Sequence, residues 1–406
     1  MAKFHVCGGK PLVGTVRVSG SKNAALPIIF ASLTTRGVSR FYNLPDITDV
    51  RDALGIIREL GAKIHNEGSV TFVDTRELHY LSVTPERVRR IRASTYLIGS
   101  CLARFGRAEL LPFGGCSFSL RPIDMHLDAA EKFGATVSGD KLTLAKLSPA
   151  EIVFRQPSVG ATVNALIMAA STEGESHIFG AAREPHILAL ISYLRSAGAR
   201  INISDGVITV VGRELSGGVA VIPGDMIEAG TYLTASLITG GDVRVTGFDP
   251  RELSAFTSPL LSAGVIERVL DGEVSIHGLP RREISVTTGA YPAFATDLQP
   301  IFSTLLAVSR GGSIEEQVWR SRFGYLDELS KFGLSYSREG NKVRIFKSDI
   351  HPACASATDL RGGASAVLLA LAADGESEIS SGELILRGYD SFVEKLKNIG
   401  ADISYQ

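Results

Sequence analysis

Six copies of one local pattern run through this chain of 406 residues. In each copy an amphipathic segment ends at a glycine and a β-rich segment follows, as in "IIRELGAKI" and "AAEKFGATV". The marker glycines are 64 to 73 residues apart, and they are Gly61, Gly134, Gly198, Gly264, Gly333 and Gly400. Glycine is the usual residue in the left-handed conformation just past a helix. The pattern therefore predicts six helices that each end at one of these glycines.

A second, apolar helix precedes the amphipathic one in each copy. Its segments are Ala-rich with almost no polar face, for example "NAALPIIFASL", "TVNALIMAAS" and "ASAVLLALAA". A helix that is apolar all round is a buried helix. With the short β segments, the repeat becomes β-α-β-α-β-β and predicts the α/β class. Because such repeats are too long for a common solenoid, we expect two globular domains of three repeats each.

Composition excludes several classes of protein. Charged residues make up 21% of the chain and the formal net charge is −1, so neither nucleic acid nor a membrane is expected as a partner. The first residues lack the apolar core of a signal peptide, and no apolar run approaches the roughly 18 residues of a membrane helix. The four cysteines are widely spaced without a C-x-x-C pair, so we expect no disulfide framework, no metal site and a reducing, cytoplasmic location.

Basic residues stand where several of the buried helices should begin. Lys22 lies in "VSGSKNAA", Arg92 in "IRASTYL" and Arg361 in "TDLRGGASAV". A cation at a helix N-terminus opposes the helix dipole and costs about 0.3–1 kcal/mol. An anionic ligand held between the cation and the free N–H groups would explain three such residues. The alternative is that Lys22 and Arg92 extend into solvent.

Familiar phosphate and hydrolase motifs do not account for these residues. The sequence has neither the G-x-x-x-x-G-K-[ST] loop that binds triphosphates nor the G-x-G-x-x-G turn of dinucleotide-binding folds. "SGSK" fits the S-x-x-K pattern of serine acyl-transfer enzymes, but S-D-N and K-T-G are absent. The pattern favours a small phosphorylated ligand instead.

Two further residues are candidates for chemistry. Cys116 lies in the Gly-rich stretch "LPFGGCSFSLRPID", where Arg121 and His126 could favour its thiolate. The glycines suit a loop that closes over a substrate. Asp297, in "YPAFATDLQP", precedes a buried helix, and its ordinary interpretation is an N-cap.

The chain resembles the UDP-N-acetylglucosamine 1-carboxyvinyltransferase family of enolpyruvyl transferases from end to end. The resemblance rests on "SGSKNAALPI", "NLPDITDV", "RAS", "GGC…RPIDMHL", "SVGAT", "AAREP", "YPAFATD", "RFGYLDEL", "DLR" and "RGYD". It implies an inverse α/β barrel of two domains with substrates bound in the cleft between them. Residues 22–225 would form the first domain with a cysteine lid loop at 112–122, and residues 1–21 with 226–406 would form the second.

The resemblance also implies a reaction. The enolpyruvyl group of phosphoenolpyruvate would pass to the 3-hydroxyl of UDP-N-acetylglucosamine through a tetrahedral intermediate, with release of phosphate, as the first committed step of peptidoglycan synthesis. No cofactor or metal would be needed. Cys116, Asp297 and Lys22 would be catalytic, and fosfomycin would alkylate Cys116. Phosphoenolpyruvate would contact Lys22, Asn23, Arg92, Arg121, Arg361 and Arg387. The UDP-sugar would contact Asn23, Arg92, Arg121, Pro122, Asp124, His126, Ser158, Val159, Gly160 and Asp297.

The sequence departs from the family pattern at five positions. They are Met226 in place of an arginine, Val163 in "SVGATVN", Arg320 and Ser321 in "WRSRF", and His186 in "REPHI". Most lie away from the residues expected to bind phosphoenolpyruvate, so the reaction type is unaffected but the acceptor is less certain. Three alternatives follow: a uridine nucleotide of a secondary pathway as acceptor, shikimate 3-phosphate as acceptor, or a non-catalytic paralogue.

Overall fold

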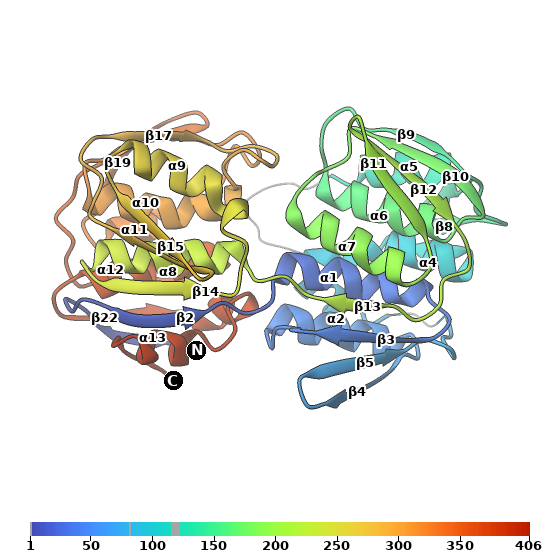
Figure 1. Ribbon diagram of the computed structural model, residues 1–406, viewed down its shortest axis with the longest axis horizontal. Helices are drawn as coiled ribbons and strands as arrows, with labels where there is room; N and C mark the ends of the chain where they lie inside the picture. The colour runs from blue at the N-terminus through green and yellow to red at the C-terminus, as the bar shows by residue number, and fades with distance from the viewer. Residues whose placement is uncertain (1, 81–82, 115–121) are drawn as a thin grey trace. The chain divides into compact units, whose positions relative to one another are not determined.

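The computed structural model describes residues 2–80, 83–114 and 122–406. The chain divides into two compact units, each with its own hydrophobic core. The continuous unit is Gly20–Pro223, and the discontinuous unit joins Met1–Ser19 to Gly224–Gln406. In both units an apolar helix such as α6 (Val159–Ala170) or α8 (Met226–Ile238) lies in the interior, and the strands lie on the outside (Figure 1).

The described residues form six small sheets, one for each repeat seen in the sequence. Five of them contain one parallel and two antiparallel strand pairs, as in the third repeat. In the third, fifth and sixth repeats a helix joins the two parallel strands and supplies the crossover that parallel pairing requires. The predicted β-α-β-α-β-β order is confirmed in the third and fifth repeats, whereas the first, fourth and sixth take one strand from a distant part of the chain.

Three repeats make up the continuous unit. The elements of the first are α1 (Lys22–Ala31), η1 (Ser32–Thr34), β3 (Val38–Tyr42), α2 (Thr48–Glu59), β4 (Lys63–Glu67), β5 (Val70–Asp74) and β13 (Val219–Val221). Those of the second are α3 (Pro85–Arg90), η2 (Arg92–Tyr96), α4 (Leu97–Phe105), β6 (Arg107–Glu109), α5 (Asp124–Lys132), β7 (Thr136–Ser138) and β8 (Lys141–Thr143). Those of the third are β9 (Glu151–Val153), α6 (Val159–Ala170), β10 (Gly174–Phe179), α7 (Pro185–Ser196), β11 (Arg200–Ser204) and β12 (Val207–Gly212).

The discontinuous unit holds the other three repeats. The fourth comprises β2 (Val13–Arg17), α8 (Met226–Ile238), β14 (Asp242–Thr246), η3 (Pro250–Leu253), α9 (Ser254–Ser262), β15 (Ile266–Leu270) and β16 (Glu273–His277). The fifth comprises β17 (Ile284–Thr287), η4 (Thr296–Leu298), α10 (Gln299–Val308), β18 (Gly312–Glu315), α11 (Tyr325–Ser330), β19 (Ser335–Glu339) and β20 (Lys342–Phe346). The sixth comprises β21 (Cys354–Ser356), α12 (Leu360–Ala372), β22 (Glu376–Ser380), η5 (Gly382–Arg387), α13 (Phe392–Asn398), β23 (Asp402–Tyr405) and β1 (Phe4–Cys7).

Both helix predictions hold. All six marker glycines adopt a positive φ, between 92° and 121°, which a side chain would make unfavourable. The apolar helices α8, α10 and α12 contact one another and are almost wholly buried. Because these helices pack against one another, the polar residues in their first turns are held at fixed positions in the unit.

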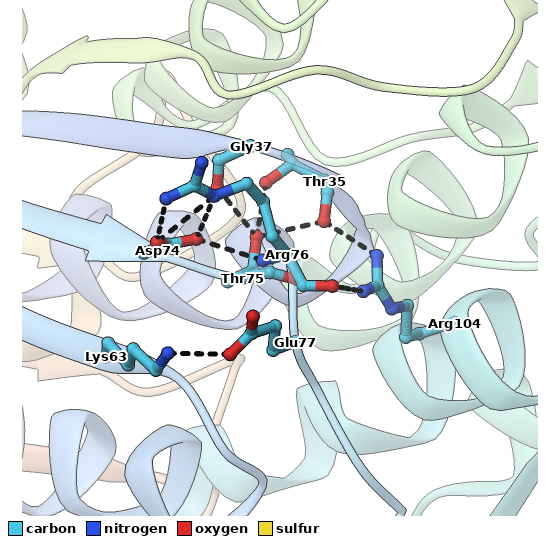
Figure 2. Close-up of polar contacts among 8 residues, drawn as sticks. All are labelled: Thr35, Gly37, Lys63, Asp74, Thr75, Arg76, Glu77 and Arg104. Atoms are coloured by element: carbon cyan, nitrogen blue, oxygen red, sulfur yellow. Dashed lines mark hydrogen bonds and ion pairs between the residues drawn. The ribbon is translucent and has the colours of Figure 1, made fainter.

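Arg104 shows how a buried helix is tied to the surrounding sheet. It lies in the last turn of α4 and donates to the backbone oxygens of Thr35 and Thr75, each at 2.8 Å (Figure 2). The Thr35 and Thr75 hydroxyls are themselves 2.9 Å apart. Burial lowers the pKa of Arg104. The guanidinium thereby joins the end of α4 to two backbone carbonyls of the first repeat.

In the part of the chain that the structure describes, no helix combines the length and the apolar character that crossing a membrane requires.

Candidate active site

Lys22 is the first residue of α1, as the sequence predicts, but it does not extend into solvent. Its Nζ lies 2.8 Å from Oδ2 of Asp49, in the first turn of α2, and the two side chains are only 15% and 4% exposed. Asp49 stabilises the cation that opposes the dipole of α1. The sequence contained this aspartate in "NLPDITDV", but nothing in the pattern identified it as the partner of Lys22. Asn23 is the next residue of α1 and is half-buried.

Arg92, His126 and Gly160 come together in the continuous unit. Arg92 opens η2, His126 is buried on α5, and Gly160 lies in the first turn of α6. A Cβ atom at Gly160 would lie 2.5 Å from His126 Nε2, so only glycine fits there. Burial, together with the positive charge of Arg92, lowers the pKa of His126 to about 4. Its imidazole is therefore neutral at physiological pH.

Several polar groups lie near His126. His126 Nδ1 is buried and has no hydrogen-bond partner within residues 2–80, 83–114 and 122–406. At the start of α6, Ser158 Oγ accepts a hydrogen bond from the Ala161 N–H at 3.4 Å. Asp124 pairs with Arg155, which holds the pKa of Asp124 below its usual range. The helix start at Val159 and Gly160 and the neutral His126 suit a polar, uncharged group such as a nucleobase or a sugar.

Asp297 lies in η4 of the discontinuous unit, between two buried arginines. Its Oδ1 accepts a 2.7 Å hydrogen bond from Nη1 of Arg322, and its Oδ2 lies 3.6 Å from Nη2 of Arg361. The N-cap interpretation is wrong, because Leu298 occupies the N-cap position of α10 and the Asp297 carboxylate is turned to the arginines instead. Asp297 is 31% exposed, so the two arginines do not enclose its side chain completely.

Arg322 was not identified from the sequence, although it begins the motif "RFGYLDEL". Burial opposes its charge, yet the carboxylates of Asp297, Asp359 and Glu316 outweigh burial and raise its pKa. Arg322 is a permanent cation beside Asp297.

Arg361 is the second residue of α12 and is 1% exposed. Its guanidinium carbon lies 5.1 Å from the centre of the Tyr389 ring. All three of its side-chain nitrogens lack a hydrogen bond to any residue that the structure describes. Since a buried cation with unused donors is costly, this arrangement favours an anionic ligand.

One detail of the anion hypothesis is wrong at α12. The N–H groups of Arg361 and Gly362 are not free, because Asp359 Oδ1 accepts from them at 2.9 and 3.2 Å. The anion-binding capacity here belongs to the Arg361 side chain and not to the helix N-terminus. Arg387, at the end of η5, is half-buried and lies two residues from Tyr389.

The family of the chain follows from comparison with known proteins. The model of a family described as EPSP synthase (3-phosphoshikimate 1-carboxyvinyltransferase) matches residues 6–396. The chain belongs to the EPSP synthase family.

Two relatives that resemble this chain over its whole length share one name. The UDP-N-acetylglucosamine 1-carboxyvinyltransferase of Halothermothrix orenii is 38% identical, with 99% of each chain covered. The UDP-N-acetylglucosamine 1-carboxyvinyltransferase 3 of Caldanaerobacter subterraneus subsp. tengcongensis is also 38% identical, again with 99% of each chain covered. The resemblance drawn from the sequence motifs is confirmed.

Solved structures of the EPSP synthase family confirm the fold. The enolpyruvyl transferase NikO from Streptomyces tendae has a TM-score of 0.90 and 28% identity, covering 100% of this chain and 99% of its own. An EPSP synthase from Acinetobacter baumannii has a TM-score of 0.73 and 17% identity with full coverage, and it shares the fold alone. The expected two-domain, EPSP synthase-like α/β class is therefore correct.

The remaining expected residues of this EPSP synthase family member are distributed as follows. Cys116 and Arg121 lie outside the described residues, and Pro122 is exposed just after them. Of the departures, Met226 opens α8 and is half-buried, Arg320 and Ser321 are exposed, and His186 is half-buried in the first turn of α7. Lys22, Asn23, Arg92, Asp124 and His126 belong to the continuous unit, whereas Asp297, Arg361 and Arg387 belong to the discontinuous one.

Proposed function

We propose that the chain transfers the enolpyruvyl group of phosphoenolpyruvate to the 3-hydroxyl of UDP-N-acetylglucosamine and releases phosphate. Full-length relatives 38% identical carry the name of this activity. The observation that carries the reaction type is the partly exposed Asp297 carboxylate beside Arg361, whose buried side-chain nitrogens have no hydrogen bond in the described chain. A base and a buried cation side by side are what an addition of a hydroxyl to an anionic enol phosphate requires.

The reaction proceeds by addition and elimination. Asp297 takes the proton of the sugar 3-hydroxyl, whose oxygen forms a bond to C2 of phosphoenolpyruvate. Cys116 donates a proton to C3, the methylene carbon of phosphoenolpyruvate. The product of this addition is a tetrahedral ketal. Loss of a C3 proton and of phosphate then restores the double bond. Lys22, Arg92, Arg121, Arg361 and Arg387 stabilise the charge of the carboxylate and of the departing phosphate.

The UDP-sugar contacts a second group of residues. The imidazole of His126 packs against Gly160 and is neutral, so it can form hydrogen bonds with the ligand without adding a charge. Arg92 attracts the diphosphate, and the start of α6 supplies backbone donors. With Asn23, Arg121 and Asp297, the proposed contacts are Pro122, Asp124, Ser158, Val159 and Gly160.

This activity is the first committed step of peptidoglycan synthesis. The two substrates are the only partners that we propose. The four cysteines are few and widely spaced, which favours a reducing compartment, the cytoplasm.

Phosphate release in the presence of different acceptors tests the proposal. The purified chain should release phosphate from phosphoenolpyruvate only when UDP-N-acetylglucosamine is also present. Other acceptors belong in the test because NikO, a solved structure with a TM-score of 0.90, is described only as an enolpyruvyl transferase. The screen therefore includes simple uridine nucleotides and shikimate 3-phosphate. Higher kcat/KM with one of these than with UDP-N-acetylglucosamine would reject the proposed acceptor.

A further inference from the structure

A fully buried carboxylate, Glu316, collects hydrogen bonds close to Asp297. Glu316 directly follows β18 and is 0% exposed. Its Oε1 accepts from the Thr288 hydroxyl at 2.8 Å and from the backbone N–H groups of Val318 and Trp319 at 2.9 and 2.8 Å. Its Oε2 accepts from the Thr296 hydroxyl at 2.9 Å. Such a group is well satisfied, as a buried charge must be.

The Thr296 hydroxyl links this carboxylate to Arg322. While it donates to Glu316, its oxygen lies 3.2 Å from Nη1 of Arg322, which donates to it. The same Nη1 donates to the Thr296 backbone oxygen at 3.1 Å and to Asp297 Oδ1 at 2.7 Å. A continuous chain of contacts thus runs from Glu316 through Thr296 and Arg322 to Asp297.

We propose that Glu316 and Thr296 are positioning residues for the base of the reaction, an inference that rests on the proposed role of Asp297. Thr296 fixes the direction of Arg322 Nη1, which occupies Oδ1 of Asp297. The other oxygen, Oδ2, lies 3.6 Å from Nη2 of Arg361 and is the oxygen that receives the proton of the acceptor hydroxyl. Without the Thr296 hydroxyl, Arg322 keeps its charge but loses one of the contacts that define its orientation. A misplacement of about 1 Å can lower the rate of a chemical step by about 100-fold.

The fold offers a matched control in Thr288. Its hydroxyl donates to the same carboxylate at almost the same distance and accepts from the Gln317 N–H at 2.9 Å. It makes no hydrogen bond to Asp297 or Arg322 in the described chain. Thr288→Val and Thr296→Val therefore each remove one hydrogen bond to Glu316. Only Thr296→Val interrupts the chain of contacts from Glu316 to Asp297.

The experiment compares kcat, KM and thermal stability of Thr296→Val, Thr296→Ser, Thr288→Val and Asp297→Asn in the full chain. Thr296→Val should lower kcat roughly 10- to 100-fold and leave both KM values within about threefold. Thr296→Ser keeps the hydroxyl and should restore kcat to within about threefold of wild type. Thr288→Val should lose as much thermal stability as Thr296→Val, with kcat near that of wild type.

Equal kcat for Thr296→Val and Thr288→Val, with Asp297→Asn inactive, would overturn this inference alone. Full turnover by Asp297→Asn, or no turnover by wild type, would reject the proposed function and this inference with it. If Thr296→Val does not fold, Glu316→Gln takes its place. Glutamine keeps the volume and one acceptor oxygen but cannot accept from Thr296 with its amide nitrogen, so kcat should again fall by about tenfold or more. Unchanged kcat in Glu316→Gln would contradict the inference.

Discussion

Arg361 and Asp297 lie 3.6 Å apart, one almost fully buried and the other about a third exposed. The two belong to helix starts of different repeats, Arg361 at α12 and Asp297 in the turn before α10. The contact between α10 and α12 brings them together. Repeat packing therefore places the proposed base and a buried cation side by side.

Arg361→Lys should lower kcat/KM for phosphoenolpyruvate by about 100-fold or more, because lysine cannot reproduce the planar, forked donors aimed at developing charge. Arg344→Lys is the control, since Arg344 is exposed and pairs only with Glu283 in the described chain. Steady-state phosphate release measures both. Equal kcat/KM in the two variants would exclude Arg361 from the site.

Asp49→Asn should destabilise the chain by about 3 kcal/mol, because Lys22 would lose its buried partner. Urea unfolding measures the change in the free energy of unfolding. Glu77→Gln removes the partner of Lys63 in an exposed pair (Figure 2) and should leave the free energy of unfolding unchanged. Similar losses in both variants would mean that the burial of the Lys22–Asp49 pair has no energetic consequence.

His126 should make stability depend on pH. Its pKa is about 4 in the folded chain, below its value in the unfolded chain, so the unfolded state binds the proton first as the pH falls. Stability is therefore lost as the pH drops from about 6.5 toward 4, by about 2 kcal/mol between pH 7 and pH 5. His126→Asn should lose less stability over that interval in urea unfolding. An identical pH slope in both proteins would argue against a neutral, buried His126.

Cys116 should be the thiol that fosfomycin alkylates. Cys101 is the comparison, because burial and the charge of Glu109 raise its pKa to about 12 and keep it unreactive. Cys354 is exposed and serves as a control for simple accessibility. Peptide mass spectrometry should find the adduct on Cys116 alone, and Cys116→Ser should lower kcat by orders of magnitude. Adducts on Cys354 instead, or full activity of Cys116→Ser, would contradict the assigned role.

Local signals in the sequence were sufficient for the repeats. The marker glycines and the apolar helices depend on neighbouring residues only, so helix ends and buried helices could be predicted. What could not be predicted is which strands complete each sheet. β1, β2 and β13 join repeats whose other strands lie far away in the chain, and no local pattern reports such pairing.

The same contrast between local and long-range signals applies to the residues of the candidate site. Lys22 and Arg361 were visible because a cation at a helix start violates a local preference. Asp49, Arg322 and Glu316 were not, since their roles arise from contacts between elements distant in sequence. The N-cap interpretation of Asp297 failed for the same reason: two arginines from later segments bind the carboxylate that a local rule assigns to the helix.

The most direct test of the central claim is the product itself. The chain is incubated with phosphoenolpyruvate and UDP-N-acetylglucosamine, and the nucleotide-sugar is analysed by mass spectrometry while phosphate is counted. The account predicts a UDP-sugar that carries one added enolpyruvyl group, with one phosphate released for each, and no product from Asp297→Asn. An unmodified UDP-sugar after incubation with folded wild-type protein would contradict it.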